Sequence, residues 1–546
     1  MGGRVRQRVI ATVGRMDRRA ATGALDSLLA SGARFSEHVV LLSALASDAE
    51  GPRLSCRRIG GLLVFDRLWE ETGCRAVLEG LLAERTFEFA VERCVFATVL
   101  HRLFVSGSDR ACEKWIGDQA IPGAEGLQLH HFYRAMAWLG EELEEADQAG
   151  RTPFAPRTTK DRIEERLFER RRDLFTDLSV VFLDTTTLCF TGAGGETLGA
   201  CGHSKDHRPD LKQMILGVVV DGDGRPVCTE MWPGNTADVS VLIPVVDRLR
   251  ARFAIGRVCV VADRGMIAKA TIAALDARGL EYVLGVRERS DALVRHVVLK
   301  DDKPFVPLCV PRAGGETDLS AKELTVAGIR YIVCRNDAEA AKDAADRAAI
   351  VAALEAQLKR GDKALIGNSA FRRFVRTTGR RFTVDHAKVA AEARLDGIYV
   401  LRTNAKITPL QAMLRYRELL VVEQLFRTAK ALVRTRPIYH SADAAIRGHV
   451  FCSFLALLLR KELHDRCRAG GFQPEWLDVL RDLDRLQQGR IEQGGKSYLV
   501  RTEATGVVPG LLKAVGLALP PRVTAAGTAH RPTRRRHPSP RKRCIA

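Results

Sequence analysis

The spacing of apolar residues changes along the chain, from a helical period near the N-terminus to strand-like runs in the middle. Apolar positions recur every three or four residues within 87–104 and again within 127–143, which predicts amphipathic helices. A charged, proline-containing connector occupies 151–172. We therefore interpret residues 1–165 as a mainly helical N-terminal domain.

Runs of β-branched and apolar residues then predict a sheet. Residues 178–188 belong to these classes almost throughout, as expected of a central strand covered on both faces. Two further strands, 214–220 and 226–231, flank the turn sequence DGDG that begins at Asp221, a strong hairpin signal. Short strands and a helix follow at 258–262, 268–278 and 282–286. This order predicts an α/β domain with a mixed sheet.

A different pattern interrupts this domain between residues 291 and 390. It contains strand-like pieces such as 329–333 and then a charged helix over 338–359. Buried-strand character resumes at 398–401, so we interpret 291–390 as an inserted subdomain. Two long helices and a small C-terminal region are expected next, at 410–433, 444–463 and 466–521.

Composition and charge narrow the choice of partner. Of the 546 residues 46% are hydrophobic, which indicates a globular protein, and the net charge is +19. Such a charge favours polyanionic partners, although basic ribosomal and membrane-surface proteins share it. The last residues, 522–546, hold eight Lys or Arg and no acid, and we expect a disordered basic tail there.

The 13 cysteines are scattered singly without a C-x-x-C pair. This pattern indicates a reducing compartment and argues against a disulfide scaffold or a structural zinc site. The N-terminus lacks an apolar signal core, and the longest apolar run, around 450–459, is too short to span a bilayer. We expect a soluble cytoplasmic protein with no membrane partner.

Two aspartates stand on predicted core strands. Asp184 lies inside the first buried run, where an ionised carboxylate is costly unless a cation or hydrogen bonds compensate. Asp263 directly follows a second buried strand, at the kind of strand end where ligands and metals collect. Either residue alone could simply cap the turn or helix that follows it. Two acids at the ends of neighbouring core strands are harder to explain in this way.

A third acid, Glu423, lies on a predicted helix. Tyr416, Glu423 and Lys430 are spaced by seven residues, so they fall within about 40° of one another on the helix surface. Leu419 borders this stripe, which therefore lies beside the buried face. The alternative is an ordinary surface ion pair between Glu423 and Arg427, worth a few tenths of a kcal/mol.

The order strand-Asp, strand-Asp, insertion, helix-Glu resembles the DDE transposases of bacterial insertion sequences. The superfamily named after insertion sequence four has the signature Tyr, two residues, Arg, three, Glu, six, Lys. Tyr416, Glu423 and Lys430 match it, whereas Leu419 occupies the Arg position, so Arg417 or Arg427 would have to supply that phosphate contact. Further stretches resemble the branch typified by insertion sequence sixteen-thirty-four, at 202–213, 232–238, 396–404 and 436–440.

The resemblance implies an RNase H-like catalytic domain, a mixed sheet flanked by helices, formed by 170–290 and 391–465. It places a β-rich insertion at 291–390 and implies DNA end recognition by the helical N-terminal domain. It also implies two Mg²⁺ ions, which Mn²⁺ may replace, bound by Asp184, Asp263 and Glu423, with Asp184 bridging both. Hard divalent cations prefer such oxygen ligands and can clamp both oxygens of a phosphodiester displacement.

The implied activity is cleavage at the terminal inverted repeats of the element and transfer of the 3′-OH strand to target DNA. The implied partners are double-stranded DNA and a second copy of the chain, at the nucleoid. The predicted DNA-binding residues are Tyr416, Arg427, Lys430, Lys205, Arg208 and Lys212. Arg434 and Arg436 add positive charge after the Glu423 helix. Cys201, His203 and His207 do not have the spacing of a tetrahedral zinc site.

Two alternatives stay open at this point. The first is an RNase H-like nuclease that cuts DNA without joining it. The second is an inactive or truncated relic that only binds DNA. The intact set of three acids argues against the relic, whereas Leu419, the position of the N-terminus and the Arg- and Pro-rich tail keep it open.

Overall fold

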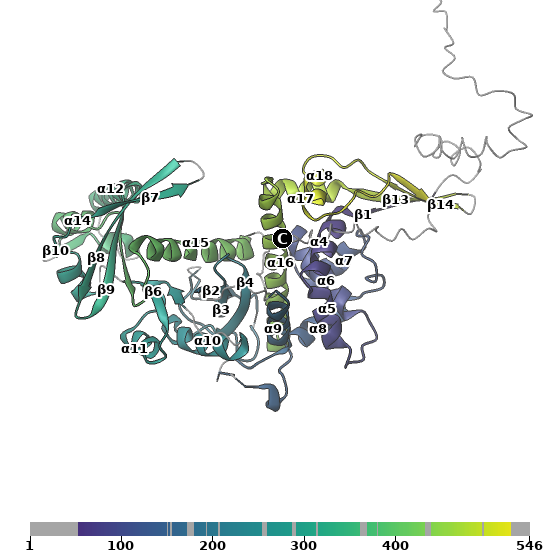
Figure 1. Ribbon diagram of the computed structural model, residues 1–546, viewed down its shortest axis with the longest axis horizontal. Helices are drawn as coiled ribbons and strands as arrows, with labels where there is room; N and C mark the ends of the chain where they lie inside the picture. The colour runs from purple at the N-terminus through teal and green to yellow at the C-terminus, as the bar shows by residue number, and fades with distance from the viewer. Residues whose placement is uncertain are drawn as a thin grey trace, which may run out of the picture. The chain divides into compact units, whose positions relative to one another are not determined.

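The computed structural model describes residues 53–149, 151–152, 155–171, 180–192, 194–205, 208–253, 259–286, 291–312, 315–360, 369–378, 381–431, 438–493 and 496–525 (Figure 1). The contacts divide the chain into two compact units. One comprises Met1–Arg67, Ile116–Ile121 and Leu463–Ala546, and the other comprises Leu68–Trp115 and Pro122–Glu462. No helix among the described residues is long and apolar enough to cross a membrane.

The first unit contains a four-stranded antiparallel sheet that joins distant parts of the sequence. Its strands, in spatial order, are β1 (Arg53–Arg58), β13 (Gln487–Gln493), β14 (Lys496–Arg501) and β15 (Val523–Ala525). The helices α17 (Trp476–Arg485) and α18 (Val508–Ala514) contact each other. Strand β15 lies within the expected basic tail, so that segment begins as a strand, and 526–546 lie outside the described residues.

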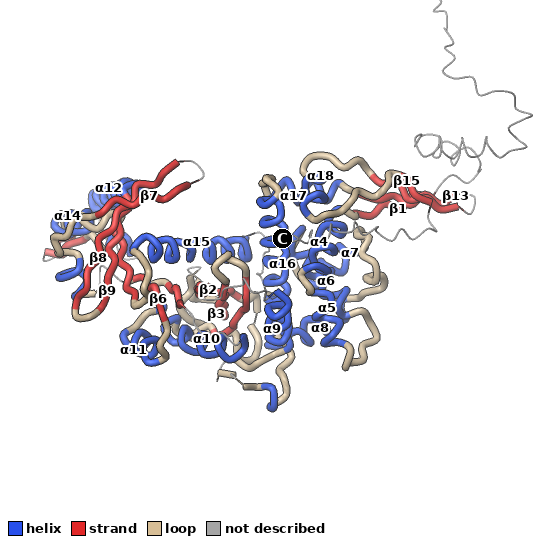
Figure 2. The backbone as a smooth tube through the Cα atoms, viewed as in Figure 1, coloured by secondary structure: helices blue, strands red, loops and turns tan. Residues whose placement is uncertain are grey.

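The helices that precede the large sheet agree with the predicted helical N-terminal region. They are α4 (Gly60–Glu71), α5 (Cys74–Leu82), α6 (Val91–Phe104), α7 (Asp109–Ile116), α8 (Leu129–Leu139), the short η1 (Glu145–Asp147) and α9 (Thr159–Arg171). Almost every residue of α6 is buried, and α6 packs against α8. The helix begins at Val91 rather than at 87, and Figure 2 shows this helical part in blue.

The second unit is built on a nine-stranded mixed sheet. Its spatial order is β4-β3-β2-β5-β6-β12-β9-β8-β7. The bounds are β2 (Val180–Cys189), β3 (Gln213–Val220), β4 (Pro226–Pro233), β5 (Cys259–Ala262), β6 (Glu281–Gly285), β7 (Val306–Arg312), β8 (Gly315–Val326), β9 (Ile329–Asn336) and β12 (Ile398–Thr403). Strands β2, β5 and β6 run parallel, and the remaining pairs are antiparallel. The predicted mixed α/β sheet is confirmed.

Helices cover both faces of this sheet. They are α10 (Asp238–Phe253), η2 (Arg264–Met266) and α11 (Lys269–Ala277) on one face, and α15 (Pro409–Ala431) and α16 (Asp443–Ala469) on the other. Side chains of β2 alternate between the two cores. Val181 and Leu183 pack with α10, whereas Phe182 and Leu188 pack with α15. Because successive strand residues point to opposite faces, Asp184 belongs to the α15 face. A mixed sheet flanked by helices is the architecture expected of an RNase H-like domain.

The insertion between β6 and β12 continues the sheet. Strand β9 pairs along the whole of β12, and β8 and β7 follow at the sheet edge. The other elements of the insertion are η3 (Val294–Val298), α12 (Asp337–Arg360), α13 (Ser369–Arg372), the hairpin β10 (Val375–Thr378) and β11 (Arg381–Val384), and α14 (His386–Ala393). The insertion is β-rich, as predicted, and its expected boundaries at 291 and 390 stay predictions.

Buried ion pairs attach α9 to the sheet and to α10. The charged groups balance, with acids and bases from three elements: Lys160, Asp161 and Glu164 of α9, Glu230 of β4, and Arg248 and Arg252 of α10. Arg252 Nη2 lies 2.7 Å from Glu164 Oε2, and Arg248 Nε lies 3.1 Å from Glu230 Oε1. Charges removed from water in this way require partners, so the network fixes where α9 packs.

Candidate catalytic site

Asp184 lies on β2, the strand between β3 and β5, and its side chain is 21% exposed. The backbone N–H of Thr185 donates to Asp184 Oδ1 over 2.7 Å. The pKa of the Asp184 carboxyl is raised to about 6, mainly by burial and to a smaller extent by the charges of Asp263 and Glu423, while Lys205 and the Thr185 N–H oppose the rise. The carboxylate therefore lies close to two other acids in an environment that disfavours its negative charge.

Asp263 follows β5, which pairs in parallel with β2. Ala262 lies opposite Leu183, so the next residues of the two strands, Asp263 and Asp184, are neighbours. Tyr416 Oη of α15 donates to Asp263 Oδ1 over 2.8 Å. Gly285 of β6 permits this approach, because a Cβ atom there would lie 2.3 Å from Tyr416 Oη. Helix α15 thus contacts the second aspartate directly.

Glu423 is carried by the same helix, which packs on β2, β5 and β6. Its side chain is 50% exposed, and Glu423 Oε2 lies 3.2 Å from Arg427 Nη2. The surface ion pair that the sequence left as an alternative is therefore present. It coexists with a position close enough to Asp184 for Glu423 to raise the pKa of that carboxyl. The structure brings together the three acids that the sequence singled out.

Lys205 also lies at this site, together with an acid that sequence reasoning missed. Lys205 Nζ is 3.3 Å from Asp238 Oδ2 and 4.0 Å from Asp184 Oδ1. Asp238 is the first residue of α10, and its Oδ1 accepts a hydrogen bond of 2.9 Å from Thr185 Oγ1. In the sequence, an acid at a helix start reads as a cap or a helix-dipole residue, which conceals this second role.

Residues 176–459 match the protein family described as "Transposase DDE domain". The chain belongs to this family. The matched range contains the nine-stranded sheet and the acids Asp184, Asp263 and Glu423. Among solved structures, the cryo-EM structure of the piggyBac transposase synaptic complex with hairpin DNA is similar at 10% identity and a TM-score of 0.34, covering 78% of this chain and 79% of that chain. No curated protein matches.

The predicted DNA-binding residues of the transposase domain have different surroundings. Arg208 Nη2 lies 2.7 Å from Asp210 Oδ2 on the surface, and Lys212 is exposed. The side chain of Lys430 lies outside the described residues, as do His207, Arg434 and Arg436. Of the rejected zinc group, Cys201 and His203 are both exposed. Whether any of these residues contacts DNA stays a prediction.

Leu419 stands where the resemblance expects an arginine. It is buried in the core between α15 and the sheet, beside Val422 and Phe426. A side chain in this environment stabilises helix packing and cannot contact a phosphate.

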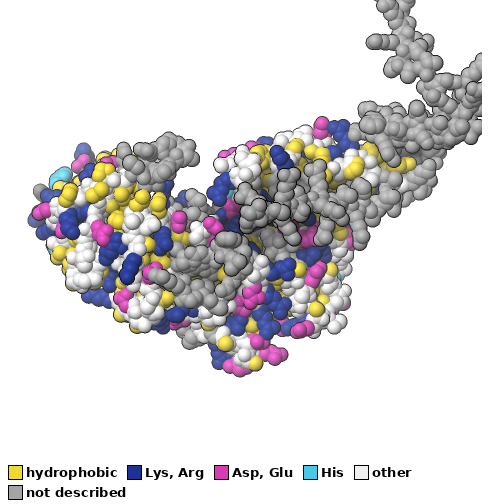
Figure 3. Space-filling model, in the orientation of Figure 1, with side chains coloured by type: hydrophobic (Ala, Val, Ile, Leu, Met, Phe, Trp, Pro, Cys, Tyr) yellow, Lys and Arg dark blue, Asp and Glu magenta, His cyan; other side chains and the backbone are white. Residues whose placement is uncertain are grey.

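On the described part of the face in Figure 3, Lys and Arg side chains are interspersed with acidic and apolar ones.

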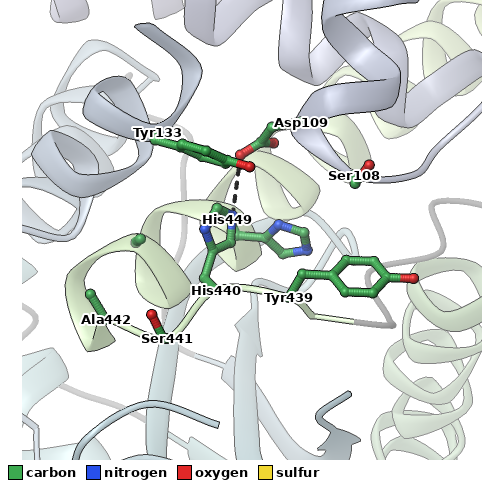
Figure 4. A pocket seen from close by; sticks show the side chains of 9 residues that line it. Ser108, Asp109, Tyr133, Tyr439, His440, Ser441, Ala442 and His449 are labelled. Carbon is green, nitrogen blue, oxygen red and sulfur yellow. Dashed lines mark ion pairs between the residues drawn. The ribbon is translucent and has the colours of Figure 1, made fainter. Parts of the chain in front are cut away.

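A separate pocket of about 240 Å³ lies near the start of α16. Figure 4 shows Asp109 of α7 and His440 beside it, with His440 Nε2 3.2 Å from Asp109 Oδ2. Asp109, His440 and His449 bring their potential ligand atoms within 4.8 Å of one another, which resembles a metal site. Sequence reasoning missed this group because Asp109 lies far from both histidines in the chain.

A neighbouring arginine argues against a cation in that pocket. Arg102 Nη2 lies 2.7 Å from His449 Nδ1, and a guanidinium group can only donate, so Nδ1 must accept. The other ring nitrogen of a neutral His449 then carries the proton and has no lone pair for a metal. Burial alone would raise the pKa of the Asp109 carboxyl, but the hydrogen bond from His440 and the charge of Arg102 hold it below its usual value. The group is a charge-balanced cluster that joins α6, α7 and α16.

Proposed function

We propose that this transposase binds the ends of its own insertion sequence, cleaves them by metal-dependent phosphodiester hydrolysis, and transfers the 3′-OH strand to target DNA. Asp184, Asp263 and Glu423 form the catalytic centre in this proposal. The observation that supports it is the convergence of three acids from β2, β5 and α15, at a position where burial and mutual repulsion disfavour the charge of Asp184.

These acids suit a divalent cation. They supply oxygen ligands, and a lysine ammonium already lies 4.0 Å from Asp184 Oδ1 as a positive stand-in. Asp184, Asp263 and Glu423 would hold two Mg²⁺ ions, or Mn²⁺ in their place, and such ions would supply activation of the attacking oxygen and stabilisation of the leaving oxygen. Asp263 is held for this role by the hydroxyl of Tyr416, and Glu423 is held by the packing of α15.

We propose the basic residues as the contacts to the DNA backbone. Arg427 and Lys430 follow Glu423 on α15, while Lys205, Arg208 and Lys212 lie between β2 and β3. Such contacts position a duplex without reading its sequence. The helical N-terminal domain is the proposed reader of the terminal repeats. We also propose that the protein forms a homodimer in the DNA complex, because an element has two ends. The mass of the complex with end DNA, measured by light scattering, tests this.

Cleavage of element-end DNA by single variants tests the proposal. Asp184→Asn, Asp263→Asn and Glu423→Gln should each reduce Mg²⁺-dependent cleavage to background while end binding persists, because the acids serve the metal rather than the DNA. Glu418→Gln is the matched control, since this exposed acid lies on the same helix. Cleavage near the wild-type rate in any of the three variants would remove that residue from the site.

The same assay separates the alternatives. A wild-type protein that binds ends but never cuts them would be an inactive relic. A protein that cuts ends but leaves the 3′-OH unjoined to target DNA would be a nuclease without strand transfer.

A further inference from the structure

The ammonium group of Lys205 is fixed by its surroundings. Lys205 Nζ donates to the backbone oxygen and to Oγ1 of Thr185 over 2.6 and 2.8 Å, and it lies 3.3 Å from Asp238 Oδ2. Thr185 Oγ1 in turn donates to Asp238 Oδ1, so Lys205, Thr185 and Asp238 form one connected hydrogen-bond network. The backbone N–H of Lys205 donates to Thr187 Oγ1 over 3.1 Å. Both ends of the residue are therefore held against β2.

The loop that carries Lys205 is packed tightly as well. Gln213 Nε2 donates to the backbone oxygen of His203 over 2.9 Å. A Cβ atom on Gly202 would lie 2.1 Å from the backbone oxygen of Gly234, so the backbones of these two residues are in direct contact. These contacts involve none of the three acids, and they hold the loop so that the partly exposed Lys205 side chain lies beside Asp184.

We propose that Lys205 is a built-in counter-charge of the catalytic site, whose ammonium, anchored by Asp238 and Thr185, competes with divalent cations for Asp184 when DNA is absent. The inference rests on the proposed metal-binding function of this site. Lys205 acts in it as a positioning residue, in addition to any contact with DNA.

The physical reason is electrostatic. A positive charge 4.0 Å from Asp184 Oδ1 partly neutralises that oxygen and repels an approaching dication. Lysine suits the role because its charge is a compact point at the end of a long stem, and Thr185 and Asp238 hold that point beside Asp184. The DNA-free protein should therefore bind metal weakly, which keeps a nuclease centre poorly loaded away from its substrate.

Titration of the full chain with Mn²⁺ in the absence of DNA tests this, followed by calorimetry or by electron paramagnetic resonance of the free ion. Lys205→Met and Lys205→Gln should bind Mn²⁺ at least about fivefold more tightly than wild type, which is the effect of removing one partly exposed charge. Lys205→Arg keeps the charge and should stay within about twofold of wild type.

Lys212→Met is the matched control for Mn²⁺ affinity, because it removes the same charge from the same connection between β2 and β3. The Lys212 backbone oxygen accepts a hydrogen bond from the Phe190 N–H, and Phe190, directly after β2, lies six positions along the extended chain from Asp184, which is about 20 Å. Its Mn²⁺ affinity should equal that of wild type. Circular dichroism verifies that each variant is folded.

Two failures can be told apart. Unchanged or weaker Mn²⁺ binding by both folded neutral variants of Lys205 overturns the counter-charge. If Mn²⁺ binding instead survives in a protein combining Asp184→Asn, Asp263→Asn and Glu423→Gln, the metal does not bind at the acids, and the proposed function of the site fails first.

Discussion

Tyr416 and Asp263, 153 residues apart in sequence, are joined by a hydrogen bond of 2.8 Å from the tyrosine hydroxyl to Asp263 Oδ1. The ring of Tyr416 is also stacked on Tyr399 of β12, with the ring centroids 6.1 Å apart. This tyrosine is the first residue of the signature around Glu423, and we predicted from the sequence that it binds DNA. Its position indicates that it orients a proposed metal ligand, a role that would also explain its fixed spacing from Glu423.

We expect Tyr416→Phe to reduce cleavage by about 10- to 100-fold, the usual effect of removing a group that orients a metal ligand. End-DNA affinity, measured by fluorescence anisotropy, should change little, because the phenyl ring keeps the packing. Tyr498→Phe on β14 of the other unit is the control. A large loss of DNA affinity with an unchanged cleavage rate at saturating DNA would instead support the predicted DNA contact.

The pKa of Asp184 predicts a pH-dependent stability. Its value of about 6 in the folded protein lies above the ordinary value of 3.8, so folding favours the protonated acid. The stability that this group contributes is present below pH 4, is lost as the pH rises from about 4 to about 6, and stays absent above that range. In EDTA at pH 7.5, Asp184→Asn should therefore be more stable than wild type by about 3 kcal/mol.

Urea unfolding from pH 4 to pH 8 measures this difference, which should shrink toward zero at the acid end. Divalent cation should stabilise the wild type and not the variant, because ligands that bind the folded state raise its stability. Equal stabilities of the two proteins at every pH would show that Asp184 ionises without cost in the fold.

Because the ion pair of Glu423 and Arg427 is exposed, we expect replacement of Arg427 to have a small effect on stability and a larger effect on DNA binding. Arg427 is 76% exposed, so Arg427→Gln should change the free energy of unfolding by less than about 0.5 kcal/mol. If Arg427 contacts a phosphate, the slope of log affinity against log salt should fall in magnitude by about 0.9. An unchanged slope would leave Arg427 as a surface partner of Glu423.

The buried network around α9 predicts the opposite behaviour. Arg252 contacts Asp161, Glu164 and Glu230, and all four side chains are at most 4% exposed. Arg252→Met should destabilise the protein by about 3–5 kcal/mol, because it leaves three buried acids with only two buried cations, Lys160 and Arg248. Arg278→Met, which breaks an exposed pair with Asp247, should cost less than about 1 kcal/mol in the same urea titration.

The sequence by itself determined the mixed sheet, its covering helices and the acids worth attention. Apolar runs mark strands such as β2 and β5 because a strand covered on both faces excludes polar residues. An acid at the end of such a strand, as at Asp184 and Asp263, is conspicuous for the same reason. Glu423 was found through its spacing from Tyr416 and Lys430, since a seven-residue step keeps one helix face.

Only the tertiary structure decided which groups surround these acids. Local pattern describes Asp238 equally well as a helix cap, and Lys205 equally well as a solvated charge. Their pairing beside Asp184 depends on how α10 and the loop before β3 pack on the sheet. Strand β1 likewise pairs with β13, and β9 with β12, although nothing in the strand sequences predicts these pairings. The spacing of apolar residues in a strand or helix records only which of its own residues are buried. Which side chains or strands from distant parts of the sequence lie against them depends on how the whole chain packs.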